Sequence, residues 1–362
     1  MKRVVLLIIS CLWLPAVAED VPNLYQGVVP VDDRSNASRQ QGISNALAQV
    51  LVKLTGDSRV LQREGVDTVL GRASDFIAAI GYKNLPPAGD SPDVRTGLQV
   101  NFSPQAIDRL IRRSQLTILP SNRPKMLLWI VRDDVQTGRQ FVSSENALDD
   151  LPGFMEILDQ RGMPWMLPQF DLQDQLALSV DDLWSLNAAT IEEASRRYPA
   201  DGWIALRYFT TSTGMVRGAW LYQVAGQREL NDVRAEDFEQ FSALAGNQLS
   251  DHIARHFFYT PETDTSEIAI QIDGVNNYRS YRIILEQLKK LELVHQLQVR
   301  RVDGNSLTLA VEVEGDIALL QSALIRSGGL ISKGREAFGV VSEAVVPGTT
   351  PGYQLIFDWI GE

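Results

Sequence analysis

The chain is poor in the residues that build disulfides and metal centres. Among its 362 residues it has one cysteine, Cys11, and three histidines. A single cysteine excludes a disulfide within the chain and a site built from several thiolates. Sequence patterns of catalysis are missing as well, because we find no G-x-S-x-G elbow, S-x-x-K, Walker A loop or G-x-G-x-x-G. The sequence therefore predicts no cofactor, no metal and no catalytic residues.

Long apolar runs are also scarce, and the one that stands out lies at the start. Lys2 and Arg3 precede a nearly unbroken apolar stretch over residues 4–14, and an A-x-A pattern follows. A basic start, a short apolar run and small residues at the cleavage position are typical of a secretory signal peptide. We expect cleavage after Ala18, with Ala16 and Ala18 at the cleavage pattern and Glu19 as the first mature residue. The predicted location is the periplasm.

A second interpretation of this segment concerns Cys11. The sequence Ile-Ser-Cys at residues 9–11 matches a loose lipoprotein signal, in which the cysteine would carry a lipid. Leu12 and Trp13 would then stand where lipoproteins usually have a polar tether. The spacing favours the cleaved signal peptide, and the lipoprotein stays open as the less favoured alternative.

Positive charge is the next deficit. The chain has 34 Lys and Arg against 45 Asp and Glu, a formal charge of −11, and loss of Lys2 and Arg3 would take it to about −13. Such a surface repels nucleic acid and anionic lipid, so we expect neither as a partner. The chain is 44% hydrophobic, enough for full cores. After signal removal we expect no transmembrane segment.

Periodicity predicts an α+β protein of three small modules. The expected domains are a signal peptide over 1–18, a β-α-α-β-α domain over 19–120, an α/β layered domain over 121–260 and a ferredoxin-like domain over 261–362. In the first we expect a strand at 24–31, helices at 35–54 and 60–80, a strand at 98–102 and a helix at 104–115. In the second, apolar runs at 126–131 and 163–167 and strands at 203–209 and 215–224 alternate with helices at 154–161, 183–198 and 235–257.

The last hundred residues predict a β-α-β-β-α-β order, that of the ferredoxin-like fold. Strands at 294–302 and 307–313 are joined through Asp303, Gly304 and Asn305, a strong hairpin signal. Residues 330–351 are expected to add a hairpin or loop.

Four segments resemble a proteobacterial envelope family that is catalogued only as domain of unknown function 2066. They are LYQGVVPVDDRS at 24–35, ALAQVLVKLTGD at 46–57, RGMPWMLPQFDLQDQLALSVDDLW at 161–184 and IEEASRRYPADGWIALRYF at 191–209. The resemblance implies an envelope protein and no particular activity. Residues 125–225 also resemble, in pattern alone, the α/β domains of TolB-like and curli-secretion-like envelope proteins. That second likeness is an architectural hint, since a fold does not fix a function.

The candidate site residues are acidic and aromatic. Asp171 and Asp174 lie in the densest acidic patch, and paired carboxylates can run acid–base hydrolysis or simply cap a helix. Trp220 and Tyr222 alternate along a strand, so an aromatic groove for sugars or peptides is one interpretation and core packing is the other. His252 and His256 are four residues apart, but the H-E-x-x-H pattern is absent.

The sequence as a whole favours a non-catalytic periplasmic binding or assembly factor of the cell envelope. Its partner would be an envelope protein or polymer, which the sequence does not identify. The alternative is a hydrolase that acts on an envelope polymer through Asp171 and Asp174. The sequence leans away from an enzyme without deciding the question, and it leaves the oligomeric state open.

Overall fold

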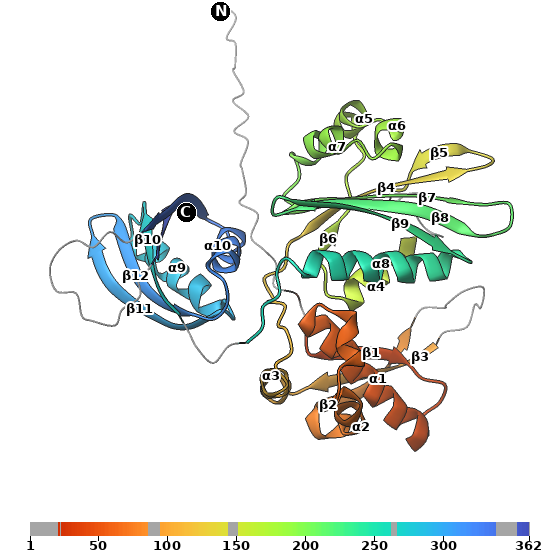
Figure 1. The fold of residues 1–362 in the computed structure, drawn as a ribbon, viewed down its shortest axis with the longest axis horizontal. Coiled ribbons are helices and arrows are strands. Elements are labelled where there is room, and N and C mark those ends of the chain that lie inside the picture. Colours follow the sequence, from red (N-terminus) through yellow and green to blue (C-terminus); the bar gives the residue numbers. More distant parts are fainter. Residues whose placement is uncertain are drawn as a thin grey trace, which may run out of the picture.

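The protein has a mixed α+β architecture, and its described residues form three separate β-sheets (Figure 1). A computed structural model describes residues 21, 23–85, 95–143, 151–261, 266–337 and 353–361. The predicted signal segment, with Cys11, Ala16, Ala18 and Glu19, lies outside the described residues. In the part that is described, no helix combines the length and the apolar character that crossing a bilayer requires.

The first sheet has the strand order β1-β3-β2 and is entirely antiparallel. Its core lies between the sheet and α1, whose Ile43, Leu47, Val50 and Leu51 are buried as the apolar stripe predicts. The elements are β1 (Gln26–Pro30), α1 (Asn36–Thr55), the 3₁₀ turn η1 (Ser58–Gln62), α2 (Val66–Gly71), η2 (Ala73–Phe76), β2 (Ile77–Leu85), β3 (Arg95–Phe102) and α3 (Pro104–Arg113).

The helix predicted over residues 60–80 is wrong in its second half. Residues 77–85 form β2, an edge strand paired with β3. The register shifts between Ile77 and Ala79, so Ile77 and Ile80 both pack on the core although they are three residues apart. A bulge in a strand therefore imitates the spacing of a helix. The observed order is β-α-α-β-β-α.

The central sheet has the order β5-β4-β7-β8-β9, with β6 also paired to β4. Figure 1 shows α5, α6 and α7 on one face of this sheet and α4 and α8 on the other. The elements are β4 (Met126–Asp134), β5 (Gly138–Phe141), α4 (Leu151–Gln160), β6 (Trp165–Met166), α5 (Leu172–Ala177), α6 (Val180–Trp184), α7 (Ala188–Ser195), β7 (Gly202–Thr210), β8 (Val216–Val224), β9 (Gln227–Ala235) and α8 (Phe238–Ala254).

Two predictions for this unit need correction. The helix expected over 183–198 is two helices, α6 and α7, because Leu186 adopts a left-handed backbone with a φ of 54°. The helix expected over 235–257 begins later, at Phe238, and a strand that the sequence did not predict, β9, precedes it. The continuous apolar run at 126–131 is a strand, β4, buried on both faces as predicted.

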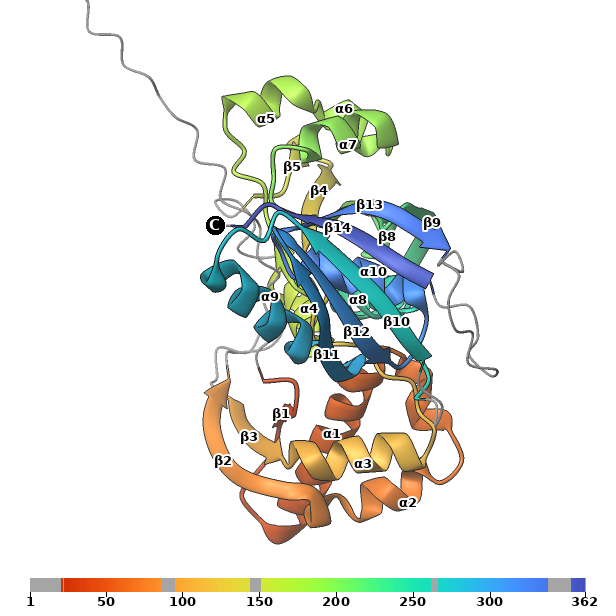
Figure 2. The same ribbon diagram turned by 90° about the vertical axis from the view of Figure 1, so that its left-hand side faces the viewer.

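The C-terminal sheet has the order β11-β12-β10-β14-β13. Its elements are β10 (Ser266–Asp273), α9 (Tyr278–Lys290), β11 (Val294–Asp303), β12 (Ser306–Val313), α10 (Ile317–Arg326), β13 (Leu330–Ala337) and β14 (Tyr353–Trp359). The hairpin at Gly304 is confirmed, since Asp303 pairs with Ser306 across it. Figure 2 shows this sheet face-on, with β10, β12 and β11 side by side.

The predicted β-α-β-β-α-β order does not include β13, a strand that lies within residues 330–351, where the sequence predicted an additional hairpin or loop. β13 is inserted between α10 and β14, at the edge of the sheet, and it pairs with β14 in the antiparallel sense. The insertion reverses the direction of the last strand, so β14 runs parallel to β10. Assignment of this unit to the ferredoxin-like fold stays a prediction.

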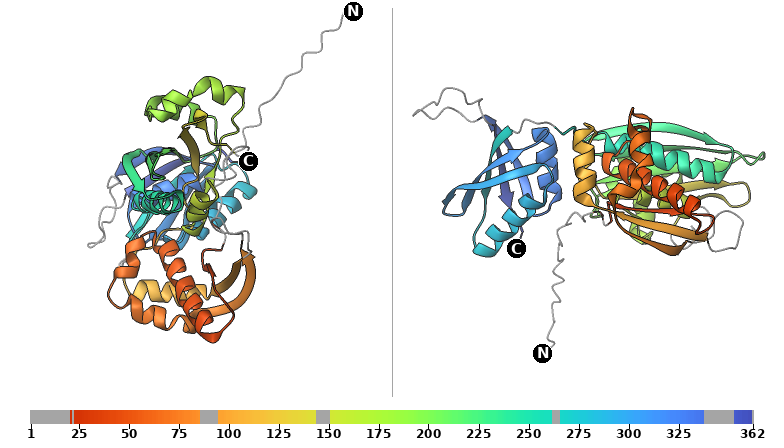
Figure 3. Two further views of the ribbon diagram at one scale, coloured as in Figure 1. Left: turned by 90° about the vertical axis from the view of Figure 1, so that its right-hand side faces the viewer. Right: turned by 90° about the horizontal axis from the view of Figure 1, so that it is seen from below.

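The two segments that connect the units pair with each other, one at Ile118 and the other at Tyr259. Ile118 forms an isolated β-bridge with Tyr259, with N···O distances of 2.7 and 2.9 Å. Figure 3 shows α3 on the side of the first unit that faces the C-terminal unit. There Arg112 of α3 lies 2.9 Å from both carboxylate oxygens of the buried Glu314, and His295 Nε2 lies 2.8 Å from Oε2.

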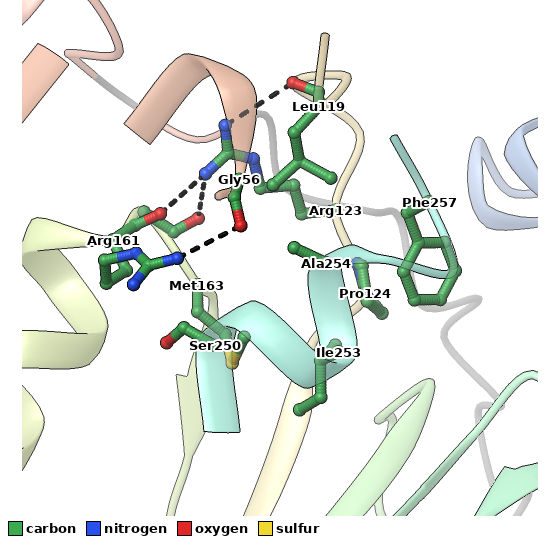
Figure 4. Close-up of a pocket in the computed structure, with 11 residues that line it drawn as sticks. Gly56, Leu119, Arg123, Pro124, Arg161, Met163, Ser250, Ile253, Ala254 and Phe257 are labelled. Carbon is green, nitrogen blue, oxygen red and sulfur yellow. Dashed lines mark hydrogen bonds between the residues drawn. The ribbon is translucent and has the colours of Figure 1, made fainter. Parts of the chain in front are cut away.

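Two buried arginines join the first unit to the central one. Arg123 Nη2 donates to the carbonyl of Lys53 at 2.6 Å, and its Nη1 donates to those of Arg161 and Gly162 at 2.8 and 2.9 Å. Arg161 in turn donates to the Gly56 carbonyl (Figure 4). It also forms an ion pair with Asp251 of α8. The cavity beside them, about 20 Å³, has room for about one water molecule. This junction is a structural joint.

Candidate anion-binding groove

The structure brings Asp171 and Asp174 together around one guanidinium. Arg197 Nη1 lies 2.6 Å from Asp171 Oδ1 and 3.0 Å from Asp174 Oδ1. Asp171 also caps α5 by accepting from the Asp174 backbone N–H at 3.0 Å, and the buried Asp174 accepts from the Tyr198 hydroxyl. The hydrogen bonds from Arg197 hold the pKa of Asp171 below its usual range.

This arrangement fits a structural role, in which it holds α5 to the end of α7, better than it fits hydrolysis. A general acid must hold a proton near neutral pH, whereas Asp171 is held ionised. Both carboxylates already receive hydrogen bonds from the same arginine, which follows α7. The pair therefore fastens α5 to the end of α7, and nothing in its geometry favours the hydrolase alternative.

Trp220 and Tyr222 lie in the core beneath α8. Both side chains are fully buried, and their rings stack with centroids 5.9 Å apart. The sequence suggested that Trp220, Leu221 or Tyr222 faces outward, but Leu221 is also buried, against the helices of the opposite face. Since the sheet is covered on both sides at this point, the structure offers no open aromatic groove at these residues.

Tyr222 belongs to a polar cluster with the two histidines of α8. Its hydroxyl lies 3.0 Å from His256 Nε2 and 3.2 Å from Glu229 Oε2, and Glu229 Oε1 lies 2.7 Å from His252 Nδ1. These contacts hold the end of α8 to the β8–β9 hairpin. Among the described residues, no group of three or more His, Cys, Asp or Glu side chains is placed to hold a metal ion.

The open part of the central sheet lies on the face opposite α8. Helices α6 and α7 pack on β4, β5 and β7, so the outer strands β8 and β9 extend beyond them. Side chains that point from β9 to this side are exposed, and Leu230 is 59% exposed although it is apolar. A sheet face that is both open and decorated with large side chains is a candidate surface for binding.

A groove of about 340 Å³ lies at the end of this open face. Strand register builds it: Phe209 pairs with Arg217, and Arg217 pairs with Arg234, which makes one row across three strands. The next row on the same face joins Arg207 to Asp232 through Ala219. Trp184, at the end of α6, closes one side of the groove.

The groove is rich in positive charge. Among the described residues that line it, three are arginines and one, Asp232, carries a carboxylate. Arg207 is held in place, because its Nη1 donates to the Trp184 carbonyl at 2.6 Å and its guanidinium lies 5.7 Å from the indole centroid. No ion pair or hydrogen bond to the Arg217 or Arg234 guanidinium occurs in the part of the chain that the structure describes.

Sequence reasoning missed this groove. The three arginines stand 10 and 17 residues apart along the chain, and no local sequence pattern groups them. Arg234 belongs to β9, the strand that was not predicted. The available signal was the spacing of two residues between Arg207 and Phe209, because residues two apart in a strand point to the same face. Arg217 likewise stands among apolar residues of its strand.

Comparisons with known proteins match the first unit to a family. Residues 18–120 match the model of a family described as Domain of unknown function (DUF8605). The predicted membership of domain of unknown function 2066 is therefore wrong. No curated protein matches the chain.

Solved structures give weak similarities. One is titled a competence-damaged protein (CinA) superfamily protein from Escherichia coli, with 17% identity, a TM-score of 0.23 and coverage of 41% of this chain and 86% of that one. Another, titled an uncharacterized protein, has 13% identity, a TM-score of 0.15 and coverage of 37% and 98%. The expected likeness to TolB-like and curli-secretion-like domains is not what these neighbours support. At such scores they carry no argument about fold or function.

Proposed function

We propose that this chain is a non-catalytic binding or assembly factor of the cell envelope that holds a carboxylate or phosphate group of its partner in the Arg207–Arg217–Arg234 groove. One observation carries the proposal. Arg217 and Arg234 stand directly opposite each other on neighbouring strands, and neither guanidinium has an acceptor among the described residues. Like charges in this position destabilise a sheet, and a bound anion would relieve their repulsion.

The chemistry of arginine fits this role. A guanidinium presents a planar fork of N–H donors that matches the two oxygens of a carboxylate or phosphate. Arg207 is fixed by Trp184 and adds a third positive group at a set position. The rings of Trp184 and the half-exposed Phe209 supply apolar contact beside the charge.

The overall charge of the chain narrows the partner. A formal charge of −11 repels an extended polyanion at long range, while the groove attracts a single anionic group at short range. A small anion, or one anionic group carried on a larger envelope component, satisfies both conditions. The periplasmic location rests on the signal pattern at residues 1–19 and is part of the proposal.

A titration tests the proposal directly. Isothermal titration of the soluble chain with pyrophosphate and with citrate should show saturable binding that weakens as salt is added. The double variant Arg217→Gln/Arg234→Gln should weaken it at least tenfold. The matched control is Arg300→Gln/Arg301→Gln, which removes two exposed arginines from the edge strand β11. Equal binding by the two double variants, or none by the natural chain, would refute the groove.

A further inference from the structure

The outer edge of β9 is the least protected sheet edge in the described part of the chain. Native proteins blunt their sheet edges with short strands, bulges or proline. At the other edges, β5 and β6 have four and two residues, β1 has five and ends in Pro30, and β2, β11 and β13 each shift register against the strand beside them. β9 has nine residues, no proline and an unbroken register with β8.

The hairpin between β8 and β9 determines which backbone groups point outward. Ala225 and Gly226 have φ angles of 50° and 76°, as in a two-residue type I′ turn, and Val224 pairs with Gln227 across them. The two residues that close such a turn exchange hydrogen bonds, and the pairs then alternate along the ladder. The even-numbered residues of β9 therefore turn their N–H and C=O groups away from β8.

Four residues of β9 present these outward groups. Within the described chain, no hydrogen bond reaches the outward N–H or C=O of any of them. The next outward amide, that of Glu236, already donates to Gln240 Oε1 at 2.7 Å. Side chains two apart share a face, so the four side chains also lie together on the open face of the sheet, and all are exposed. They are Arg228, Leu230, Asp232 and Arg234.

The pattern of these four side chains complements itself. In chain order they are basic, apolar, acidic and basic. When two copies of β9 are paired antiparallel about Leu230, Arg228 of each copy stands opposite Asp232 of the other. The two Leu230 side chains, each 59% exposed in a single chain, meet at the centre. On the other face of the ladder, Glu229 stands opposite Asn231, a carboxylate opposite an amide.

The neighbouring registers lack this complementarity. A pair centred one residue later places Arg228 opposite Arg234, and a pair centred on Asp232 places its two carboxylates against each other. Like charges that stand directly opposite destabilise a ladder. Charge therefore selects the register that is centred on Leu230.

Both charged residues of that register have groups left for a second copy. No ion pair or hydrogen bond to the Asp232 carboxylate occurs among the residues that the structure describes. Arg228 donates through Nε to Gln223 Oε1 at 2.8 Å and through Nη2 to Glu192 Oε2 at 3.3 Å, and its side chain is 45% exposed. Its Nη1 has no acceptor in the described chain.

We propose that two copies of this chain associate through β9, antiparallel and centred on Leu230, so that their central sheets join across a two-fold axis. The second copy supplies partners for the outward backbone groups, covers Leu230 and pairs Arg228 with Asp232 twice. Gly226 of the second copy then stands opposite Arg234 and adds no side chain there. The pairing is thus compatible with the anion groove, and it does not depend on the groove.

A charge-reversal experiment tests both the pairing and its register. Sedimentation velocity of the soluble chain over a concentration series should show a monomer–dimer equilibrium. Arg228→Asp and Asp232→Arg each place like charges opposite each other twice, and each should weaken dimerisation at least tenfold. An equimolar mixture of the two variants should form a heterodimer, because acid again meets base at both positions. Recovery in the mixture also shows that both variants are folded.

The controls separate the β9 pairing from other contacts and from the anion groove. Leu230→Lys places two ammonium groups at the centre and should abolish the dimer, whereas Val302→Lys changes a side chain of similar exposure, 63%, on the bulged edge strand β11 and should not. Leu230→Lys should still bind pyrophosphate, and Arg217→Gln/Arg234→Gln should still dimerise, so the two proposals can fail independently.

Three outcomes would overturn the proposal. The first is a chain that stays monomeric at concentrations up to about 100 µM, since a dissociation constant above that range gives an association of less than about 5.5 kcal/mol. The second is a dimer that Leu230→Lys leaves intact. The third is a mixture of Arg228→Asp and Asp232→Arg that remains monomeric although thermal unfolding shows both variants to be folded.

Discussion

Four arginines of this chain occupy two opposite environments. Arg123 and Arg161 are buried at 3% and 6% exposure, between the first and the central unit. Arg217 and Arg234 lie exposed on an open sheet face of the central unit. The buried pair donates to carbonyl oxygens and to the carboxylate of Asp251, whereas no hydrogen-bond acceptor for the exposed pair occurs among the described residues.

This difference separates arginines that stabilise the fold from arginines whose N–H donors are free to bind a partner. Transfer of a guanidinium out of water is unfavourable. In this fold the carbonyl oxygens of Pro120, Arg161 and Lys53 accept hydrogen bonds from Arg123 and compensate for the lost hydration. Burial lowers the pKa of Arg123 to about 9, so it stays charged at neutral pH. An exposed arginine stays hydrated and needs no protein acceptors, so its N–H donors remain available to a partner.

The largest expected effect follows from removal of Arg123. Arg123→Met fills similar space but leaves the carbonyls of Lys53, Arg161 and Gly162 without their donor. We expect a loss of about 3–5 kcal/mol in the free energy of unfolding, because buried polar groups lose their partners. Urea unfolding at neutral pH measures this loss.

Arg123→Lys sharpens the same test. An ammonium group carries the charge but cannot reach carbonyls on both sides of the junction, as the planar fork does. It should therefore recover only part of the stability. A full rescue by lysine, or a loss below about 1 kcal/mol for methionine, would show that the carbonyl network does not hold the units together.

A smaller loss is expected when the carboxylate at the junction is neutralised. Asp251 pairs with Arg161 and also accepts from the Ser58 backbone N–H at 3.0 Å and from its hydroxyl at 2.6 Å. Asp251→Asn keeps the shape and removes the charge, so we expect about 1.5–3 kcal/mol. A double-mutant cycle with Ser58→Ala should give a coupling energy clearly different from zero. Additive losses would mean that the two contacts act separately.

The buried half of this comparison was partly accessible from sequence. The apolar stripe of α1, the buried run of β4 and the hairpin at Gly304 are local patterns, and each appears where it was predicted. Trp129 and Trp203 were expected in the core and are buried there. Local periodicity carries this information, because it depends only on which side of an element faces the interior.

The exposed arginine pair could not be predicted from the sequence, for a physical reason. β9 is an edge strand with polar residues on both sides of its open half, so it lacks the alternation that marks a half-buried strand. Without β9 the row of Arg217 and Arg234 has no basis in the sequence. The joint at Arg123 was hidden for a related reason, since its acceptors are backbone carbonyls, which residue identity does not reveal.

The smallest effect on stability is expected for the exposed arginine pair. Arg217→Gln/Arg234→Gln removes two opposed like charges that have no partner among the described residues. We expect the free energy of unfolding to change by less than about 0.5 kcal/mol or to rise slightly, because opposed like charges cost a few tenths to 1 kcal/mol. Salt should narrow the difference, since exposed charges are screened.

The sign of this effect distinguishes the two kinds of arginine. A structural arginine lowers stability when it is removed, whereas one kept for a partner leaves stability unchanged or raises it while binding is lost. Urea unfolding at low and high salt, compared with Arg300→Gln/Arg301→Gln, gives the answer. A loss above about 1 kcal/mol for the groove variant alone would place Arg217 and Arg234 with Arg123 and Arg161 as structural groups. It would also remove the main reason for expecting an anion in the groove.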